Sequence, residues 1–299
     1  MISYRNKIEL PKPLWNQDSI KCVMLPSGAF LVASIVGPEV ILYDSRESSL
    51  LHSRLDVDLS SMTAIDDTHV SILSADQRSL VLFNFLSNKI ELKTDLNFFA
   101  SALLFLESGW IVAGLNDQHV FHSVSFDGSV LVSFGSSDVL KQCSDTGVMG
   151  SLGSWDVYGY KGFFSFLGAE RNAFVFAYSF VPIVQAFQIQ GTPVWTTVLH
   201  PKGNLSSYMR SSWNSILRQR QSLDFLLVEL NDDLAVGGRI AVLHTPPMRK
   251  REMSVLELSG VQSEIVTLPH AMDAVFWHKE KFVLVRRNSK KTLQVWEYQ

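Results

Sequence analysis

The sequence predicts an all-β fold, a six-bladed β-propeller built from four-stranded antiparallel blades. One short pattern recurs six times: an apolar strand, a turn rich in Gly, Asn, Asp or charged residues, and a very apolar second strand. The copies are Val23–Val32, Ala64–Leu73, Phe105–Val112, Leu167–Phe176, Glu229–Val236 and Trp277–Val285. Two further strands follow most copies, and an all-strand unit of roughly 40 residues is typical of a propeller blade.

The strands of the first five blades are expected in chain order. Blades 1 to 3 comprise residues 20–25, 29–35, 39–45 and 51–55; then 62–65, 69–74, 79–86 and 89–93; then 100–106, 109–114, 119–125 and 130–134. Blades 4 and 5 comprise residues 162–167, 173–179, 183–189 and 194–198; then 224–230, 234–244, 252–258 and 264–268. Asp127-Gly128, between the last two strands of blade 3, is a strong hairpin signal.

The sixth blade has only three strands of its own, at residues 273–277, 282–287 and 292–298. The amino-terminal segment 6–10 precedes the first blade and belongs to no other unit. We expect it to pair with residues 292–298 and close the propeller, because this removes two exposed sheet edges. An open stack of antiparallel sheets and a seven-bladed ring are the alternatives.

Two long connections, residues 135–161 and 200–223, interrupt the repeat and are expected as insertions in a single domain spanning residues 1–299. Each joins the outer strand of one blade to the inner strand of the next, so both should emerge on one face. Long connections of this kind tend to carry function. Apolar residues at helical spacing after Ser206 predict a short helical insertion near residues 205–220.

Aromatic and basic residues in and beside these insertions are the candidate ligand-binding residues. Tryptophan and tyrosine offer apolar faces with polar tips, and a guanidinium suits a carboxylate or phosphate. Residues 200–222 and 244–251 contain no carboxylate. The candidates are Trp155, Tyr158, Tyr160, Tyr208, Trp213, Arg218, Arg220, Arg249 and Arg251. Packing of the aromatic residues against the blades, and a merely solvated basic loop, are the alternatives.

The composition indicates a soluble protein with a large core, because 46% of the 299 residues are hydrophobic and 18% are charged. The net charge of −3 gives no general attraction to nucleic acid or to a membrane surface, so neither is an expected partner. Cys22 and Cys143 lack CxxC spacing, and the chain opens without an apolar signal segment. We therefore expect a reduced compartment and a cytoplasmic protein.

Sequence motifs for nucleotide binding, zinc hydrolysis, calcium loops and serine nucleophiles do not occur. Ala173–Ser179 with Phe187–Gly191 resembles the strand–loop–strand–turn unit of TolB-like, NHL-like and gluconolactonase-like six-bladed propellers. The gluconolactonase-like resemblance implies a divalent metal held by acidic side chains near the channel mouth. Asp18, Asp224 and Asp273, each expected at the start of an inner strand, are the candidate ligands, and calcium is the ion that suits them. No other cofactor is expected.

These observations favour a non-catalytic or regulatory binding propeller that holds an anionic small molecule, peptide or protein on the inserted face. The alternative is an enzyme with a channel-mouth site, either a lactonase-like hydrolase or a strictosidine-synthase-like lyase or cyclase. Convergent carboxylates with a metal would favour the enzyme, and an aromatic pocket with arginines at its rim would favour binding. The oligomeric state does not follow from the sequence.

Overall fold

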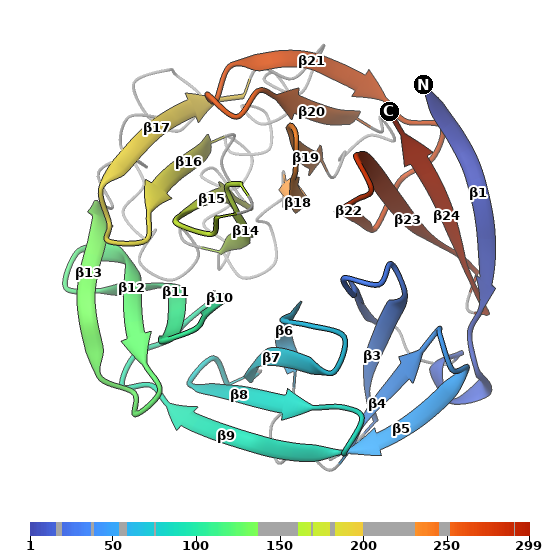
Figure 1. Cartoon of the computed structure of the whole chain (residues 1–299), viewed down its shortest axis with the longest axis horizontal. Coiled ribbons are helices and arrows are strands. Elements are labelled where there is room, and N and C mark those ends of the chain that lie inside the picture. The colour runs from blue at the N-terminus through green and yellow to red at the C-terminus, as the bar shows by residue number, and fades with distance from the viewer. Residues whose placement is uncertain are drawn as a thin grey trace, which may run out of the picture. The chain divides into compact units, whose positions relative to one another are not determined.

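Six four-stranded antiparallel sheets, the blades of a β-propeller, make up the described chain (Figure 1). The structure is a computed structural model that describes residues 1–15, 20–36, 39–53, 59–74, 76–136, 161–168, 170–179, 183–199, 231–244, 252–289 and 291–299. These residues contain no α-helix, and a short 3-10 turn lies at Lys12–Leu14. The predicted fold class is confirmed, whereas the helix expected near residues 205–220 lies outside the described residues.

The strand bounds follow the repeat. Blade 1 contains β2 (Lys21–Met24), β3 (Phe30–Val36), β4 (Glu39–Asp44) and β5 (Ser49–Ser53), and blade 2 contains β6 (Leu59–Ala64), β7 (His69–Ser74), β8 (Ser79–Asn84) and β9 (Lys89–Asp95). Blade 3 contains β10 (Ala102–Leu106), β11 (Gly109–Asn116), β12 (His119–Ser125) and β13 (Val130–Ser136), and blade 4 contains β14 (Gly162–Phe166), β15 (Ala173–Tyr178), β16 (Ile183–Gln188) and β17 (Pro193–Val198). Blade 5 contains β18 (Asn231–Val236), β19 (Ile240–His244), β20 (Glu252–Leu256) and β21 (Gln262–Thr267), and blade 6 contains β22 (Ala274–His278), β23 (Lys281–Ser289), β24 (Thr292–Tyr298) and β1 (Ile2–Glu9).

The chain divides into two compact units. The first comprises Met1–Gly114, Phe121–Ser133 and Phe276–Gln299, and the second comprises Leu115–Val120 and Phe134–Val275. Blades 1 and 2 lie wholly in the first unit, and blades 4 and 5 lie wholly in the second. The single-domain organisation remains a prediction.

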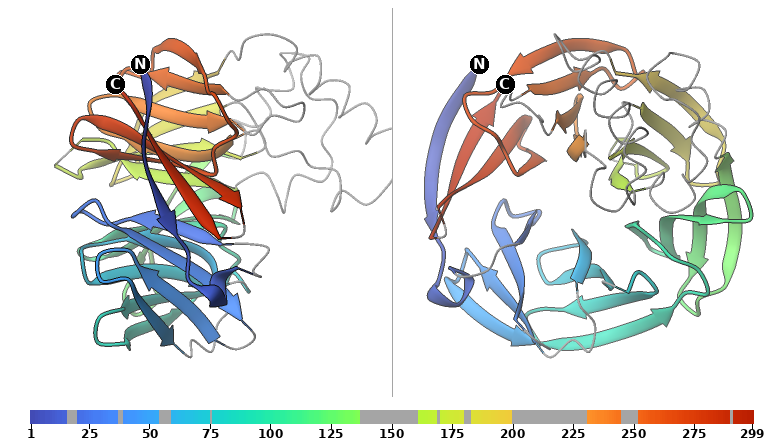
Figure 2. Two further views of the ribbon diagram at one scale, coloured as in Figure 1. Left: turned by 90° about the vertical axis from the view of Figure 1, so that its right-hand side faces the viewer. Right: turned by 180° about the vertical axis from the view of Figure 1, so that it is seen from behind.

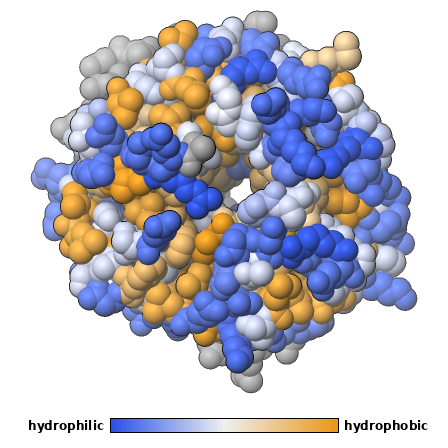
Figure 3. Space-filling model, viewed as in Figure 1, coloured by the Kyte–Doolittle hydropathy of each residue, from blue (hydrophilic) through white to orange (hydrophobic). Residues whose placement is uncertain are grey.

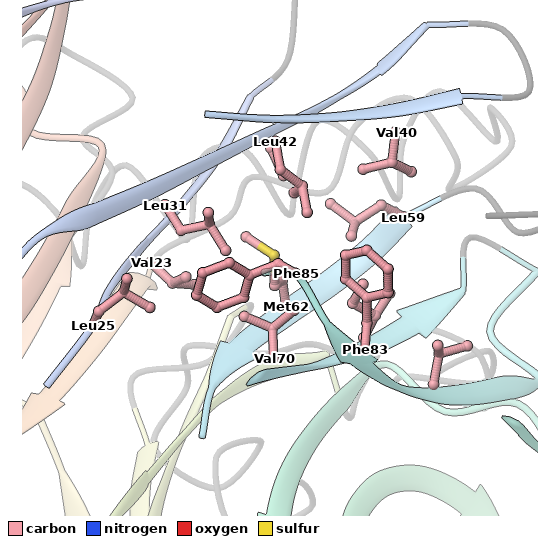
Figure 4. Packing of buried hydrophobic residues seen from close by; sticks show 13 residues of the cluster. Val23, Leu25, Leu31, Val40, Leu42, Leu59, Met62, Val70, Phe83 and Phe85 are labelled. Atoms are coloured by element: carbon pink, nitrogen blue, oxygen red, sulfur yellow. The ribbon is translucent and has the colours of Figure 1, made fainter. Parts of the chain in front are cut away.

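Hydrophobic cores lie between neighbouring sheets within each unit. Between blades 1 and 2, a buried cluster includes Leu31, Leu42, Met62 and Phe85, and Figure 4 shows these side chains pointing toward one another from the two sheets. Successive side chains of a strand point to opposite faces, so Tyr43, next to Leu42 on β4, lies on the other face of blade 1. This alternation places Tyr43 on the side where a cleft is found.

The predicted closure of blade 6 by the amino-terminal segment is confirmed. Strand β1 pairs antiparallel with β24 from Ile2, opposite Tyr298, to Glu9, opposite Thr292, with a bulge between Tyr4 and Asn6. Figure 2 shows β1 lying along β24. The strand is longer than predicted, and the amino group of Met1 donates to the Gln299 carbonyl over 3.2 Å.

The prediction for the first two strands of blade 5 was wrong. Residues 234–244 do not form one strand, because a hairpin at Gly237-Gly238 separates β18 from β19, with the Gly237 amide donating to the Arg239 carbonyl. The first strand starts at Asn231 instead of residue 224. A carboxylate is tolerated in this strand because Asp233 accepts hydrogen bonds from the amides of Leu234 and Val275.

Candidate partner-binding surface

Most of the predicted site residues lie outside the described residues: Trp155, Tyr158, Tyr160, Tyr208, Trp213, Arg218, Arg220, Arg249, Arg251, Asp18 and Asp224. Asp273 is described and directly precedes β22, as expected for the start of a first strand. Asp224 was expected to open blade 5, and the first described strand of that blade, β18, begins at Asn231. In the described part of the chain, no three His, Cys, Asp or Glu side chains are placed to hold a metal. Calcium binding remains a prediction.

The two basic segments predicted to bind a ligand attach to the same end of blade 5. Each blade has two ends, and we call the end at which its first strand begins the leading end. Because the strands are antiparallel, the connection between the second and third strands also lies at this end. In blade 5, Asn231 of β18 pairs with His244 of β19, and His244 pairs with Glu252 of β20. The segment that ends at residue 230 and the segment 245–251 therefore leave the sheet from directly paired residues.

Hydrogen-bonded polar side chains hold the leading end of blade 5 in place. Nε2 of His244, which is 6% exposed, lies 2.8 Å from the Ser254 hydroxyl oxygen on β20. Asp233 on β18 accepts the Val275 amide of β22 over 2.8 Å, which ties the start of one first strand to the start of the next. Buried polar groups with complete hydrogen bonds rigidify the sheet that carries them.

At the leading ends of blades 2 and 6, an exposed cation is stacked on an aromatic ring. The Arg78 guanidinium carbon lies 4.1 Å from the centre of the Phe99 ring, and the Lys291 Nζ lies 4.4 Å from the Trp15 ring. Phe99 is 56% exposed, so its ring is accessible beside the guanidinium. Arginine and aromatic residues are enriched in protein interfaces.

The two stacked pairs occupy equivalent positions in their blades. Arg78 and Lys291 each directly precede the third strand, and the carbonyl of each accepts the amide of the leucine that follows the fourth strand. These bonds are 2.6 Å long for Leu96 and 2.8 Å long for Leu10. In blade 5 the residue before the third strand is also basic, Arg251. Sequence analysis missed this recurrence, although a cation before the third strand of blades 2, 5 and 6 was the available signal.

The charge of Arg78 is only partly compensated by the nearest carboxylate. Asp76 lies in the same turn, and its carboxylate accepts hydrogen bonds from the Ser74 hydroxyl and the Arg78 amide. These bonds, the Ser74 hydroxyl first, hold the pKa of Asp76 below its usual value. No ion pair joins Arg78 or Lys291 to a carboxylate in the described residues. Both cations therefore remain able to pair with a partner's acidic group.

Comparison with known proteins supports the fold and no more. No protein-family model matches the chain, and no curated protein is detectably similar in sequence. Among solved structures, the chain is similar to the β-propeller domain of Cps50 (Swd1) from Myceliophteria thermophila, with a TM-score of 0.57 and 10% sequence identity. The similarity covers 94% of this chain and 83% of that one. The six four-stranded sheets thus have the architecture of a β-propeller.

Proposed function

We propose that this chain is a non-catalytic binding propeller that holds an acidic segment of a partner protein at the leading ends of its blades. The observation that carries the proposal is that three blades place a basic residue directly before the third strand, and two of these residues are exposed and stacked on aromatic rings. Stacking on a ring restricts a long side chain before binding, so less conformational entropy is lost in the complex.

An extended acidic segment fits Arg78 and Lys291 better than a compact anion does, because they come from two different blades of the first unit. In the second unit, the segments that adjoin blade 5 contain Arg218, Arg220, Arg249 and Arg251, which we propose as binding residues in their own right. The proposal includes a cytoplasmic location and membership in the TolB-like, NHL-like and gluconolactonase-like group. A likeness to a propeller domain fits a binding role. No described helix is long and apolar enough to cross a membrane.

Charge reversal tests the proposal. The probe is a short fluorescein-labelled peptide of alternating glutamate and leucine, and its binding is followed by fluorescence anisotropy. We expect Arg78→Glu with Lys291→Glu to weaken binding at least about tenfold, because like charges across an interface repel. Reversal of Arg218, Arg220, Arg249 and Arg251 should have the same effect, and added salt should weaken the wild-type complex.

Lys89→Glu is the matched control, because Lys89 starts β9 at the opposite end of blade 2 and is also exposed. It should leave peptide binding unchanged. Thermal melting checks that the variants are folded, since an exposed cation–π pair contributes only about 0.5–1 kcal/mol. Equal losses in the control and the test variants, or binding that neither reversal changes, would contradict the proposal.

A further inference from the structure

A cleft of about 350 Å³ lies between β1 and blade 1, within the first unit. Five consecutive residues, Arg5–Glu9, form one wall, so the cleft runs along the edge of β1 that has no neighbouring strand. Its volume is within the range of roughly 300–1,000 Å³ that is usual for small-molecule sites. The cleft is separate from the leading-end surface proposed above.

The opposite wall comes from turns and strands of blade 1. It consists of Gly28, Phe30, Tyr43, Ser45 and Ser48. Gly28 has a φ of +86°, and a Cβ there would lie 2.6 Å from Nε2 of His278, so a larger residue would strain the backbone and displace the His278 ring. Phe30 and Tyr43 are 4% and 7% exposed and form the apolar part of the wall.

The cleft does not suit pairing with another strand. The edge of β1 carries Arg5, Lys7 and Glu9, and a bulge interrupts it between Tyr4 and Asn6. Charged side chains and bulges are the features by which proteins prevent edge-to-edge pairing. A small ligand is therefore the occupant that the cleft fits.

Hydrogen-bond donors dominate the lining. The Tyr43 hydroxyl forms no hydrogen bond with a described residue, although the side chain is more than nine-tenths buried. The hydroxyl oxygen itself is not fully buried, because it reaches the cleft, where it is available to a ligand. The Ser45 hydroxyl oxygen accepts the Phe30 amide over 2.8 Å, which leaves its proton to donate.

The charges of the cleft favour an anion. Lys7 Nζ lies 2.7 Å from Glu9 Oε1, so the lining carboxylate is already compensated. Arg5 Nε lies 3.4 Å from Glu297 Oε1, and Lys281 Nζ lies 3.1 Å from the other oxygen of Glu297. Among the lining residues, Arg5 and Lys7 are cationic and Glu9 is anionic, which leaves one net positive charge. A guanidinium with one pairing nitrogen still offers further N–H donors.

We propose that this cleft binds a small ligand through an oxyanion group, a phosphate or a carboxylate. Arg5 compensates the charge of that group, and the Tyr43 hydroxyl donates a hydrogen bond to it. Phe30 contacts the remainder of the ligand. The proposal does not depend on the leading-end surface.

Titration of the intact chain with inorganic phosphate and with acetate, each against chloride at equal ionic strength, tests the proposal by isothermal calorimetry. We expect saturable binding of at least one probe, and the preferred probe identifies the oxyanion. Tyr43→Phe should weaken that binding about tenfold without changing Tm, because the hydroxyl has no bond to lose within the described part of the chain. Arg5→Gln should weaken it by a similar factor.

Tyr178→Phe is the matched control: it removes a hydroxyl that is hydrogen-bonded to Gln185, so it should lower Tm and leave probe affinity unchanged. The Arg78→Glu and Lys291→Glu variant should also keep its affinity, which separates this site from the leading-end surface. Failure of both probes to saturate would overturn the proposal. So would a Tyr43→Phe protein that binds as tightly as the wild type.

Discussion

Tyr178 in blade 4 and Tyr43 in blade 1 are both buried in a sheet, yet their hydroxyl groups have opposite surroundings. The Tyr178 hydroxyl donates to Gln185 Oε1 over 2.7 Å, and Gln185 Nε2 donates to the Thr196 hydroxyl oxygen over 3.1 Å. The Tyr43 hydroxyl opens on the cleft and has no such bond in the described chain. Burial alone therefore does not separate a structural polar residue from one available to a ligand; the completeness of its hydrogen bonds does.

Deleting residues 1–9 should have the largest effect on stability. The deletion removes the β1 wall of the cleft that Tyr43 lines, and it leaves blade 4 with Tyr178 intact. The deletion exposes the edge of β24 and removes an eight-residue strand. We expect a loss of several kcal/mol from a total free energy of unfolding of about 5–15 kcal/mol. Urea unfolding measures this loss, and an unchanged midpoint would show that β1 does not hold blade 6 together.

Stability measurements on the two Tyr→Phe variants should sharpen the comparison. Tyr178→Phe leaves the buried Gln185 carbonyl oxygen without its donor, so we expect a cost of about 1–3 kcal/mol. Tyr43→Phe should change the free energy of unfolding by no more than about 0.5 kcal/mol. Urea titrations without added oxyanion measure both values. Equal losses of unfolding free energy would mean that the Tyr43 hydroxyl also has a hydrogen-bond partner within the protein. The proposed difference between Tyr43 and Tyr178 would then be wrong.

Blade 2 gives a third case, an exposed polar cluster in which both ring nitrogens of a histidine have partners. The cluster consists of His69, Asp66 and Glu91. His69 Nδ1 lies 3.0 Å from Asp66 Oδ2, and Nε2 lies 3.2 Å from Glu91 Oε1. Burial opposes protonation of His69, but the hydrogen bonds to Asp66 and Glu91 outweigh it and raise the pKa of the imidazole above its ordinary value. The protonated ring then bridges two carboxylates.

The smallest predicted effect is the pH dependence of this bridge. Since the folded-state pKa is the higher one, its stabilisation is complete below the unfolded pKa of about 6.5 and is lost as the pH rises through the folded-state pKa. His69→Gln should therefore cost more at about pH 5.5 than at about pH 9, by less than about 1 kcal/mol because the groups are screened. Urea unfolding at both pH values measures the difference. A cost independent of pH would exclude a protonated bridge.

The blades could be predicted because strand alternation and turn residues recur in every repeat. The turn at Asp127-Gly128 forms as expected, with the Gly128 amide donating to the Ser125 carbonyl. Blade 5 was misread at Asn231–Asp233, because consecutive polar residues there resemble a turn, while the actual turn is Gly237-Gly238. Long-range bonds such as that from Val275 to Asp233 decide such cases, and a local pattern does not contain them.

The cleft could not be predicted because its two walls are far apart in the sequence. Lys7 and Tyr43 face one cleft only after β1 has paired with β24. The stacking of Arg78 on Phe99 likewise depends on the backbone bond from Leu96 to Arg78. The basic composition of residues 200–222 and 244–251 can be read from the sequence. That both segments adjoin paired residues of blade 5 follows only from the strand register, in which Asn231 pairs with His244.

The pairing of β1 with β24 also has a consequence for synthesis on the ribosome. Strand β1 is synthesised before its partner β24, which emerges only after blades 1–5 have been translated. During that interval β1 is an unpaired strand in a crowded solution, where apolar strands associate wrongly. The charged side chains of Arg5, Lys7 and Glu9 keep β1 hydrated until β24 has been synthesised. Translation speed through the last blade should therefore influence the yield of correctly closed molecules.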